Sequence, residues 1–326
     1  MAIDWKKIQS YLENLAVGVQ AHIAPLKKTD AWVGEGTSGD IVSKADHAAA
    51  KFIRDELMRS CPVPCSLMDE DSAQLVPIHN DPVIGIIADQ IDGTRPLIMH
   101  MPLFTTTMAA FELKDKPTLS NVMTSVIQTA SGEQFSFVKG QGVKVNGQPW
   151  HNPGAASPSL KDLRISFDSA GGIPSLGLEY AAPFHPSYLK GFIMMNSTGF
   201  AISRILTGGL HCHIHIGARL KEQWPELESI ASQGSYGVTG LNIWDIAASV
   251  PLLLEAGMSA STMDGRSLDD AALDDSPPPK GYHLVAAVDE TTRRTVMEML
   301  LDQESRLTED RQATINRIKY VYDNPS

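Results

Sequence analysis

Residues 82–97 read PVIGIIADQIDGTRPL, an aliphatic run that ends in two aspartates and continues into glycine and threonine. A continuous apolar run bounded by turn residues indicates a strand buried on both faces. Asp89 and Asp92 then stand at its carboxyl end, where open α/β sheets bind their ligands. The alternative is a solvated turn, since Asp and Gly are common turn residues. The rest of the chain has to decide between the two.

The composition is that of a globular protein. The chain has 326 residues, of which 43% are hydrophobic and 20% are charged. A formal net charge of -11 repels nucleic acid and anionic membranes, so neither is expected as a partner. The same charge repels phosphate unless bound cations reverse the local field.

The three cysteines, Cys61, Cys65 and Cys212, supply no disulfide framework and fit a reducing compartment. Cys61 and Cys65 lack a second pair at zinc spacing, so we expect structural roles. Residues 1–26 contain acidic residues and no continuous apolar segment, which argues against a signal peptide and favours a helix. No apolar stretch is long enough to span a bilayer. The expected location is therefore the cytoplasm.

The first half of the chain predicts a helix followed by a sheet. Residues 41–60 have helical character, with Ser43 as N-cap and Asp46 at the capping-box position. Strand-like runs then follow one another without an intervening helix, which indicates an antiparallel sheet. These runs are 83–89, 104–113, 119–130, 133–140 and 143–150.

The stretch HNPGAASPS, residues 151–159, predicts a subdomain boundary. Beyond it, strand-like and helical segments alternate in an α/β pattern. We expect an N-terminal α+β subdomain at 1–152 that carries the metal-binding motifs, and a C-terminal α/β subdomain at 153–303. The charged residues 304–326 form a surface helix or tail.

Several segments together resemble the inositol monophosphatase family. Residues 88–98, ADQIDGTRPLI, resemble its Asp-Pro-Ile-Asp-Gly-Thr signature, and residues 67–72, LMDEDS, stand where the family has a Gly-Glu-Glu-Ser turn. Further motifs match in the family's order at 40–53, 132–150, 196–209 and 244–265. The resemblance implies a layered αβαβα sandwich, of α+β or α/β class and of the inositol monophosphatase and sugar phosphatase type. It also implies a Mg²⁺-dependent, lithium-sensitive phosphatase that commonly dimerises.

The resemblance also implies the site residues, with two or three Mg²⁺ ions per active site. Glu70, Asp89 and the backbone carbonyl of Ile91 would hold one ion, and Asp89, Asp92 and Asp245 a second. Hard cations take such oxygen ligands. The implied catalytic residues are Glu70, Asp46 and Thr94, with Asp46 accepting a proton from the Thr94 hydroxyl. The implied substrate-binding residues are Asp92, Gly93, Thr94, Arg95, Ser197, Thr198 and Asp245.

The resemblance determines the substrate less directly than it determines the fold and the metal ligands, because this sequence departs from the family pattern near the site. Gln90 replaces the usual proline, which removes no ligand, and the substrate-recognising glutamate of the family has no secure counterpart. Arg95 either reaches a second phosphate or a carboxylate on the substrate, or pairs with a neighbouring acid. Inositol monophosphate is the leading substrate. Fructose bisphosphate, phosphoadenosine phosphate and a non-catalytic metal- or phosphometabolite-binding relative are the alternatives.

Three histidines alternate in HCHIH, residues 211–215. In a strand, His211, His213 and His215 share one face. They either bind a transition metal or belong to a partly exposed strand that lines the substrate cleft.

Overall fold

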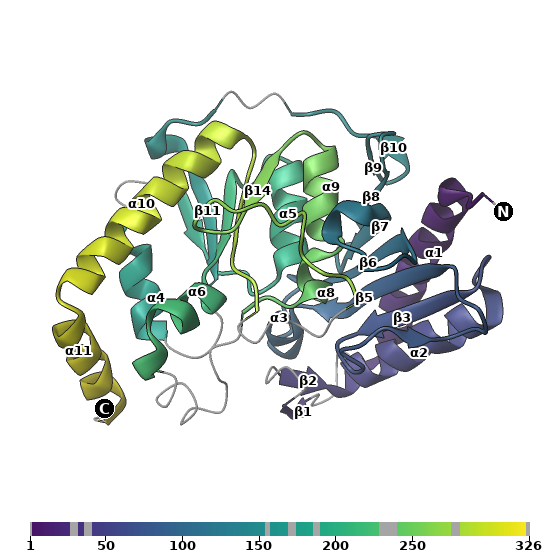
Figure 1. Ribbon diagram of the computed structural model, residues 1–326, viewed down its shortest axis with the longest axis horizontal. Helices are drawn as coiled ribbons and strands as arrows, with labels where there is room; N and C mark the ends of the chain where they lie inside the picture. Colours follow the sequence, from purple (N-terminus) through teal and green to yellow (C-terminus); the bar gives the residue numbers. More distant parts are fainter. Residues whose placement is uncertain are drawn as a thin grey trace.

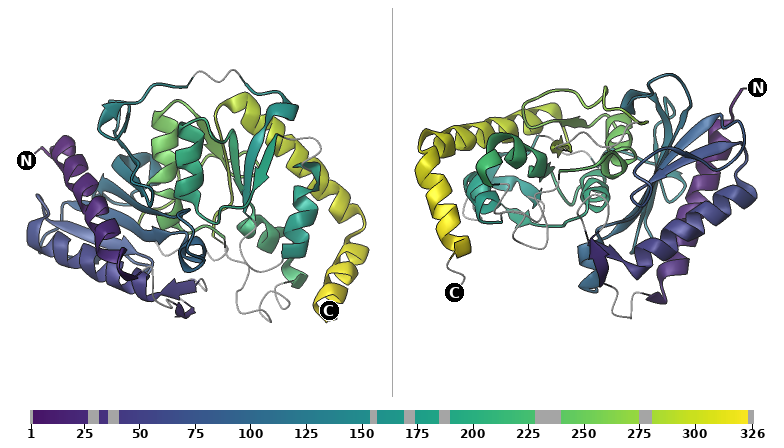
Figure 2. Two further views of the ribbon diagram at one scale, coloured as in Figure 1. Left: turned by 180° about the vertical axis from the view of Figure 1, so that it is seen from behind. Right: turned by 60° about the horizontal axis from the view of Figure 1, so that its bottom comes forward.

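The computed structural model describes residues 2–26, 32–35, 41–153, 157–168, 174–184, 190–227, 240–274 and 281–323. Helices and sheets alternate in layers along the long axis of the molecule, and the two termini lie at opposite ends (Figures 1 and 2). The layer order is helices, an eight-stranded sheet, helices, a five-stranded sheet and helices. This arrangement confirms the predicted αβαβα sandwich.

The first layer consists of α1 (Trp5–Ile23) and α2 (Lys44–Ser60), which pack on one face of the large sheet. Asp4 caps α1, and Ser43 and Asp46 form the predicted capping box of α2. Each cap satisfies backbone N–H groups that have no partner within the helix. Leu12 and Ile53 are among the apolar residues that these helices bury against the sheet.

The large sheet has the strand order β10-β9-β8-β7-β6-β5-β3-β4. From β5 to β10 every pairing is antiparallel, as predicted, and only β3 and β5 run parallel. All nine residues of β5 are buried, which confirms the buried strand. The strands are β3 (Cys65–Asp69), β4 (Val76–Pro77), β5 (Ile84–Asp92), β6 (Thr105–Glu112), β7 (Val122–Thr129), β8 (Gln134–Val138), β9 (Val143–Val145) and β10 (Gln148–Pro149).

Several shorter elements accompany the large sheet and the helices. Strands β1 (Trp32–Glu35) and β2 (Ile41–Ser43) form a separate antiparallel pair. Helix α3 (Thr94–Ile98) follows β5. Short 3-10 turns lie at Leu119–Asn121, Leu160–Asp162, Ala182–Phe184 and Pro225–Leu227.

The central layer lies between the two sheets and is made of α5 (Thr198–Leu206), α8 (Ile243–Ile246) and α9 (Ser249–Glu255). These helices contact β5, β6 and β7 on one side, and α5 and α9 contact β13 and β14 on the other. They supply a third of the buried residues of an apolar cluster, among them Phe200, Ile202 and Trp244. A helix placed between two sheets must be apolar around most of its circumference, and α5 is buried at eight of its nine positions.

The second sheet has the order β12-β11-β13-β15-β14, with β11 parallel to both β12 and β13. Its strands are β11 (Arg164–Asp168), β12 (Gly191–Ile193), β13 (Cys212–His215), β14 (Ser259–Ser261) and β15 (Leu284–Ala287). The outer helices are α4 (Pro174–Ala181), α6 (Gly217–Gln223), α10 (Glu290–Glu309) and α11 (Arg311–Asp323). Within the described residues, no helix combines the length and the apolar character needed to cross a membrane.

The charged segment expected as a surface helix or tail is helical, and one face of it is buried. The proposed division at residue 304 falls inside α10. Leu307, Ile315 and Ile318 belong to the apolar cluster of the outer layer. In addition, the guanidinium of Arg311 stacks over Trp224, 4.6 Å from the ring centre. Residues 304–321 therefore contribute to the core beneath the second sheet.

Candidate active site

The carboxyl end of β5 bulges where its two aspartates stand. Asp89 pairs with Thr107 and Asp92 with Thr105, so three steps on β5 face two on β6. Such a bulge turns side chains away from the regular alternation of a strand. Both carboxylates are buried, with only 4% of Asp89 and 5% of Asp92 exposed. The alternative of a solvated turn is therefore wrong.

Asp92 connects the end of β5 to the start of α5. Its Oδ1 accepts the backbone N–H of Thr198 at 3.1 Å. Its Oδ2 accepts from three donors: the hydroxyls of Thr105 and Ser197, both at 2.9 Å, and the backbone N–H of Gly199 at 2.5 Å. Burial raises the pKa of Asp92, and these hydrogen bonds oppose the rise. Its position is thus fixed by a segment more than 100 residues away in the sequence.

Two glycines are required for this close packing. Gly93 has φ +104°, and a Cβ there would lie 3.0 Å from Cβ of Ser197. A Cβ on Gly199 would lie 2.7 Å from Oδ2 of Asp92 and 2.5 Å from the Thr105 hydroxyl. Gly199 excludes a side chain for steric reasons. At Gly93 a Cβ would be tightly packed, and the backbone conformation itself favours glycine.

Asp245 completes a group of three carboxylates. It lies in the first turn of α8, where it accepts the backbone N–H of Asn242 in a capping box. One oxygen each from Asp89, Asp92 and Asp245 lies within 4.8 Å of the others. Burial, together with the charges of Asp92, Asp245 and Glu70, raises the pKa of Asp89 well above its usual value. An all-oxygen, anionic donor set that repels itself in this way fits a hard divalent cation.

Glu70 joins this group from the turn after β3. It lines the same pocket as the three aspartates and is 8% exposed. The turn is held by its neighbour Asp69, which accepts a bidentate pair from Arg54 at 2.9 and 3.2 Å and the backbone N–H of Ser72 at 2.8 Å. This structural role of Asp69 was not predicted from the sequence.

Thr94 and Asp46 are in hydrogen-bond contact, as the resemblance implied. The Thr94 hydroxyl lies 3.2 Å from Oδ1 of Asp46 and 3.3 Å from the carbonyl oxygen of Ile91. Asp46 is fully buried behind the pocket wall and also accepts from the backbone N–H and hydroxyl of Ser43. Burial raises the pKa of Asp46 to about 6, against the effect of these bonds.

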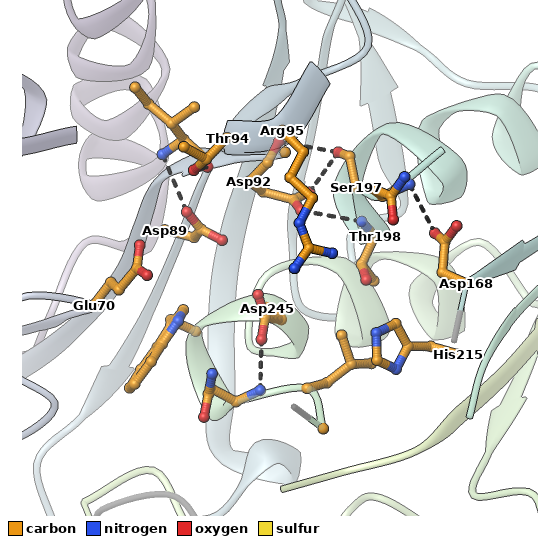
Figure 3. A pocket seen from close by; sticks show the side chains of 17 residues that line it. Glu70, Asp89, Asp92, Thr94, Arg95, Asp168, Ser197, Thr198, His215 and Asp245 are labelled. Carbon is orange, nitrogen blue, oxygen red and sulfur yellow. Dashed lines mark hydrogen bonds between the residues drawn. The ribbon is translucent and has the colours of Figure 1, made fainter. Parts of the chain in front are cut away.

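These residues line one pocket of about 690 Å³, a volume that includes its open mouth (Figure 3). All implied site residues except Asp46 lie in its wall. They are Glu70, Asp89, Ile91, Asp92, Gly93, Thr94, Arg95, Ser197, Thr198 and Asp245. The wall also contains residues that we did not predict: Asp168, Asn196, Gly240, Leu241, Asn242 and Trp244.

Asp168 is the most informative of the unpredicted residues. It ends β11 and accepts the backbone N–H groups of Met195 and Asn196, both at 3.0 Å. It thereby holds the loop that leads into α5. Burial raises the pKa of Asp168 to about 7, although these bonds and the charge of Arg95 lower it. Its position at the carboxyl end of a buried strand, like that of Asp89, was the available sequence signal.

The three alternating histidines have separate environments. His211 contacts the backbone N–H and the guanidinium of Arg164. His213 is fully buried, 4.0 Å from Asp168. His215 is 8% exposed and is the only one of the three in the pocket wall. They form no three-residue ligand group, so the transition-metal site is wrong. The strand is buried and not partly exposed, but the prediction that it lines the cleft is confirmed for His215.

The fold and the pocket define a class of protein: a layered α/β enzyme with a buried, acidic site at the end of a strand. Comparison with known proteins specifies the family. The family model for the inositol monophosphatase family matches residues 5–305. The chain belongs to this family, and it is therefore a phosphoric monoester hydrolase.

Individual relatives are distant. The inositol-1-monophosphatase of Mesorhizobium japonicum is 27% identical over 70% of this chain and 74% of its own length. The solved structure of the extragenic suppressor protein SuhB from Bartonella henselae has a TM-score of 0.67 at 19% identity, covering 90% of this chain and 98% of that one. An IMPase/NADP phosphatase solved with Mg²⁺ and phosphate has a TM-score of 0.66 at 18% identity, covering 90% and 95%. These two structures establish the fold.

Proposed function

We propose that the protein uses Mg²⁺ to hydrolyse small-molecule phosphate monoesters, with inositol monophosphate as the leading substrate. The observation that carries the proposal is the placement of three aspartates within 4.8 Å of one another in the same pocket as Thr94, whose hydroxyl contacts Asp46. The IMPase/NADP phosphatase solved with Mg²⁺ and phosphate has the same fold and supports the choice of metal.

The oxygen ligands fall into two overlapping sets. Glu70, Asp89 and the carbonyl of Ile91 would hold one Mg²⁺, and Asp89, Asp92 and Asp245 would hold another. Bound Mg²⁺ supplies positive charge that offsets the carboxylates, binds phosphate oxygens and activates a water molecule. The protein contributes rigidity: Asp92 is fixed by four hydrogen bonds and Asp89 by the backbone N–H of Ile91 at 3.1 Å.

Thr94 and Asp46 would act together as the base. The Thr94 hydroxyl donates to Asp46, so its oxygen is left to accept a proton from the attacking water. As that proton moves to Thr94, the hydroxyl proton moves to Asp46. Asp46 must be ionised for this step, and its pKa of about 6 keeps it ionised at neutral pH.

The phosphate and the alcohol of the substrate would bind in the remaining space. Backbone N–H groups of Gly93 and Thr94 suit phosphate oxygens, because glycine lets a ligand approach the main chain. Ser197, Thr198 and Arg95 line the same pocket and would contact the rest of the ester.

A phosphate-release screen tests the proposal. Inositol monophosphate, fructose bisphosphate and phosphoadenosine phosphate are each supplied with Mg²⁺ and with excess chelator. We expect release only with the metal, and the highest kcat/KM for inositol monophosphate. Full activity in chelator would refute the metal requirement. Metal-dependent binding without release of phosphate would instead favour a non-catalytic relative.

We also propose a homodimer in the cytoplasm. The dimer follows from the family resemblance, and light scattering of the purified protein tests it. The location is supported by three free cysteines, of which Cys65 and Cys212 are buried.

A further inference from the structure

The pocket has two chemically different sides. Glu70 and Asp89 lie on one side in Figure 3, and Asp168 and His215 lie on the other. The side chain of Arg95 extends into the space between them. The acidic side accounts for the metal ions and the scissile phosphate in the proposed function. The side with Arg95 and His215 has no role in that chemistry.

Arg95 brings a positive charge to this second side. It follows Thr94 directly in α3, so its position is fixed relative to the reacting group. The positive charge of Arg95 acts on Asp168 and His215, because it lowers the pKa of both side chains. Burial is the larger influence on each pKa. A guanidinium offers several N–H donors in a plane, an arrangement that suits phosphate and carboxylate oxygens.

His215 brings a buried polar ring. It is the last residue of β13 and pairs with Asp168 across the sheet. Its Nδ1 is buried and has no hydrogen-bond partner within the described residues. Burial lowers the pKa of His215 to about 3, so the ring is neutral at physiological pH. His215 as a whole is 8% exposed and lies in the pocket wall, so part of its ring is open to a ligand.

Asp168 leaves this side of the pocket open to an anion. One of its oxygens accepts from Met195 and the other from Asn196, so both are directed to the loop before α5. Its pKa of about 7 also reduces its average negative charge near neutrality. Asp168 is a single carboxylate, whereas the acidic side carries Glu70, Asp89, Asp92 and Asp245, so an anion is repelled less on the side of Arg95 and His215.

We propose that Arg95 and His215 form a subsite for a second anionic group, a phosphate or a carboxylate, on the alcohol part of the phosphate ester. The inference rests on the proposed function, since it assumes that the scissile phosphate occupies the acidic side. It adds esters whose alcohol carries its own negative charge to the expected substrates.

The test compares matched ester pairs that differ by one anionic group. An inositol bisphosphate against inositol monophosphate tests a second phosphate, and phosphoglycerate against glycerol phosphate tests a carboxylate. For the parent protein we expect a higher kcat/KM for the doubly charged member of at least one pair. In Arg95→Gln that preference should fall by about tenfold or more, mainly through KM, because a charge-assisted contact is lost. His215→Phe, which keeps a ring without nitrogen atoms, should reduce the same preference.

The control is Arg59→Gln, which removes an equal charge from an exposed position on α2. It should leave the preference unchanged. An equal loss on both members of each pair in Arg95→Gln, or no preference in the parent, would overturn the subsite. If no ester is hydrolysed, the proposed function fails. Calorimetric titration of the same pairs with Mg²⁺ then decides on the subsite, which is refuted if Arg95→Gln binds both members as the parent does.

Discussion

The carboxylate of Asp92 and the backbone N–H of Gly199 lie 2.5 Å apart, and this contact joins the end of β5 to the first turn of α5. The N-terminus of a helix favours negative charge, so α5 stabilises the ionised aspartate. The same carboxylate belongs to the acidic group with Asp89 and Asp245. Asp92 therefore serves the packing of the two layers and the proposed metal site at once.

We predict that Asp92→Asn lowers kcat by at least about a hundredfold, because a charged ligand oxygen is lost. The melting temperature without metal should also fall. An amide NH₂ group cannot accept a hydrogen bond. In the asparagine variant the backbone N–H of either Thr198 or Gly199 would therefore lose its acceptor. Kinetics at saturating Mg²⁺ and thermal unfolding in chelator measure the two effects. Parental activity would show that Asp92 holds no metal.

We predict that Gly199→Ala is inactive and less stable, because its Cβ would lie 2.5 Å from the Thr105 hydroxyl and 2.7 Å from Asp92. The added Cβ would force Thr105 or Asp92 to shift, although hydrogen bonds hold both side chains in place. Gly191→Ala is the control, since its Cβ would meet only the Arg164 side chain at 3.5 Å. Equal melting temperatures and activities for the two variants would contradict the close packing around Asp92.

We predict that Thr94→Val lowers kcat by about a hundredfold or more, since the shape is kept and the hydroxyl that contacts Asp46 is removed. Thr94→Ser keeps the hydroxyl and should stay within about tenfold of the parent. The change should appear in kcat more than in KM. The relay would be refuted if the valine and serine variants had the same kcat.

We predict that Asp168→Asn changes how stability depends on pH. The folded-state pKa of Asp168 is raised to about 7, so the folded protein binds a proton that the unfolded chain releases near pH 4. Stability from this group is complete below the unfolded pKa and is lost as the pH rises through the folded pKa. Asparagine does not titrate, so the Asp168→Asn variant does not lose stability in this way as the pH rises. Its melting temperature in chelator, relative to the parent, should therefore rise between about pH 4 and pH 8. A constant difference would contradict the raised pKa.

We predict that Glu304→Ala destabilises the protein by about 3 kcal/mol, because it leaves the largely buried guanidinium of Arg219 with only its longer contact to Glu222, at 3.4 Å, among the acidic residues that the structure describes. Glu304 accepts two N–H groups of Arg219, at 2.6 and 2.9 Å, and the Tyr180 hydroxyl at 3.0 Å. Glu309→Ala, on an exposed position of the same helix, is the control. Chemical denaturation measures both. Equal stabilities would show that the contact of Glu304 with Arg219 does not stabilise the outer layer.

Short sequence patterns predicted the parts of the fold that depend on interactions between residues close together in the chain. The aliphatic run before Asp89, the capping box of Ser43 and Asp46, and the antiparallel strands all follow from residues within a few positions of one another. The layer order and the pairing of Thr94 with Asp46 came from resemblance to a family. Whether residues 1–152 and 153–303 are independent folding units stays a prediction.

The unpredicted parts of the site depend on contacts between distant segments. Asp168 and His215 face the pocket because β11 and β13 pair in one particular register, which no short stretch of sequence reveals. The burial of the histidines depends on the helices that cover both faces of their sheet. The buried face of the C-terminal segment depends on a surface supplied in part by Trp224 and Tyr180.

The acidic group also has a consequence for the way the molecule holds together. Asp89 and Asp92 precede residues 151–159 in the chain, and Asp245 follows them. Without a counter-ion, their mutual repulsion opposes the packing of α8 on β5 of the large sheet, and a shared divalent cation would reverse the sign of that force. Such an ion would be a reversible cross-link between the halves of the chain, and the concentration of free cation would set how tightly it joins them.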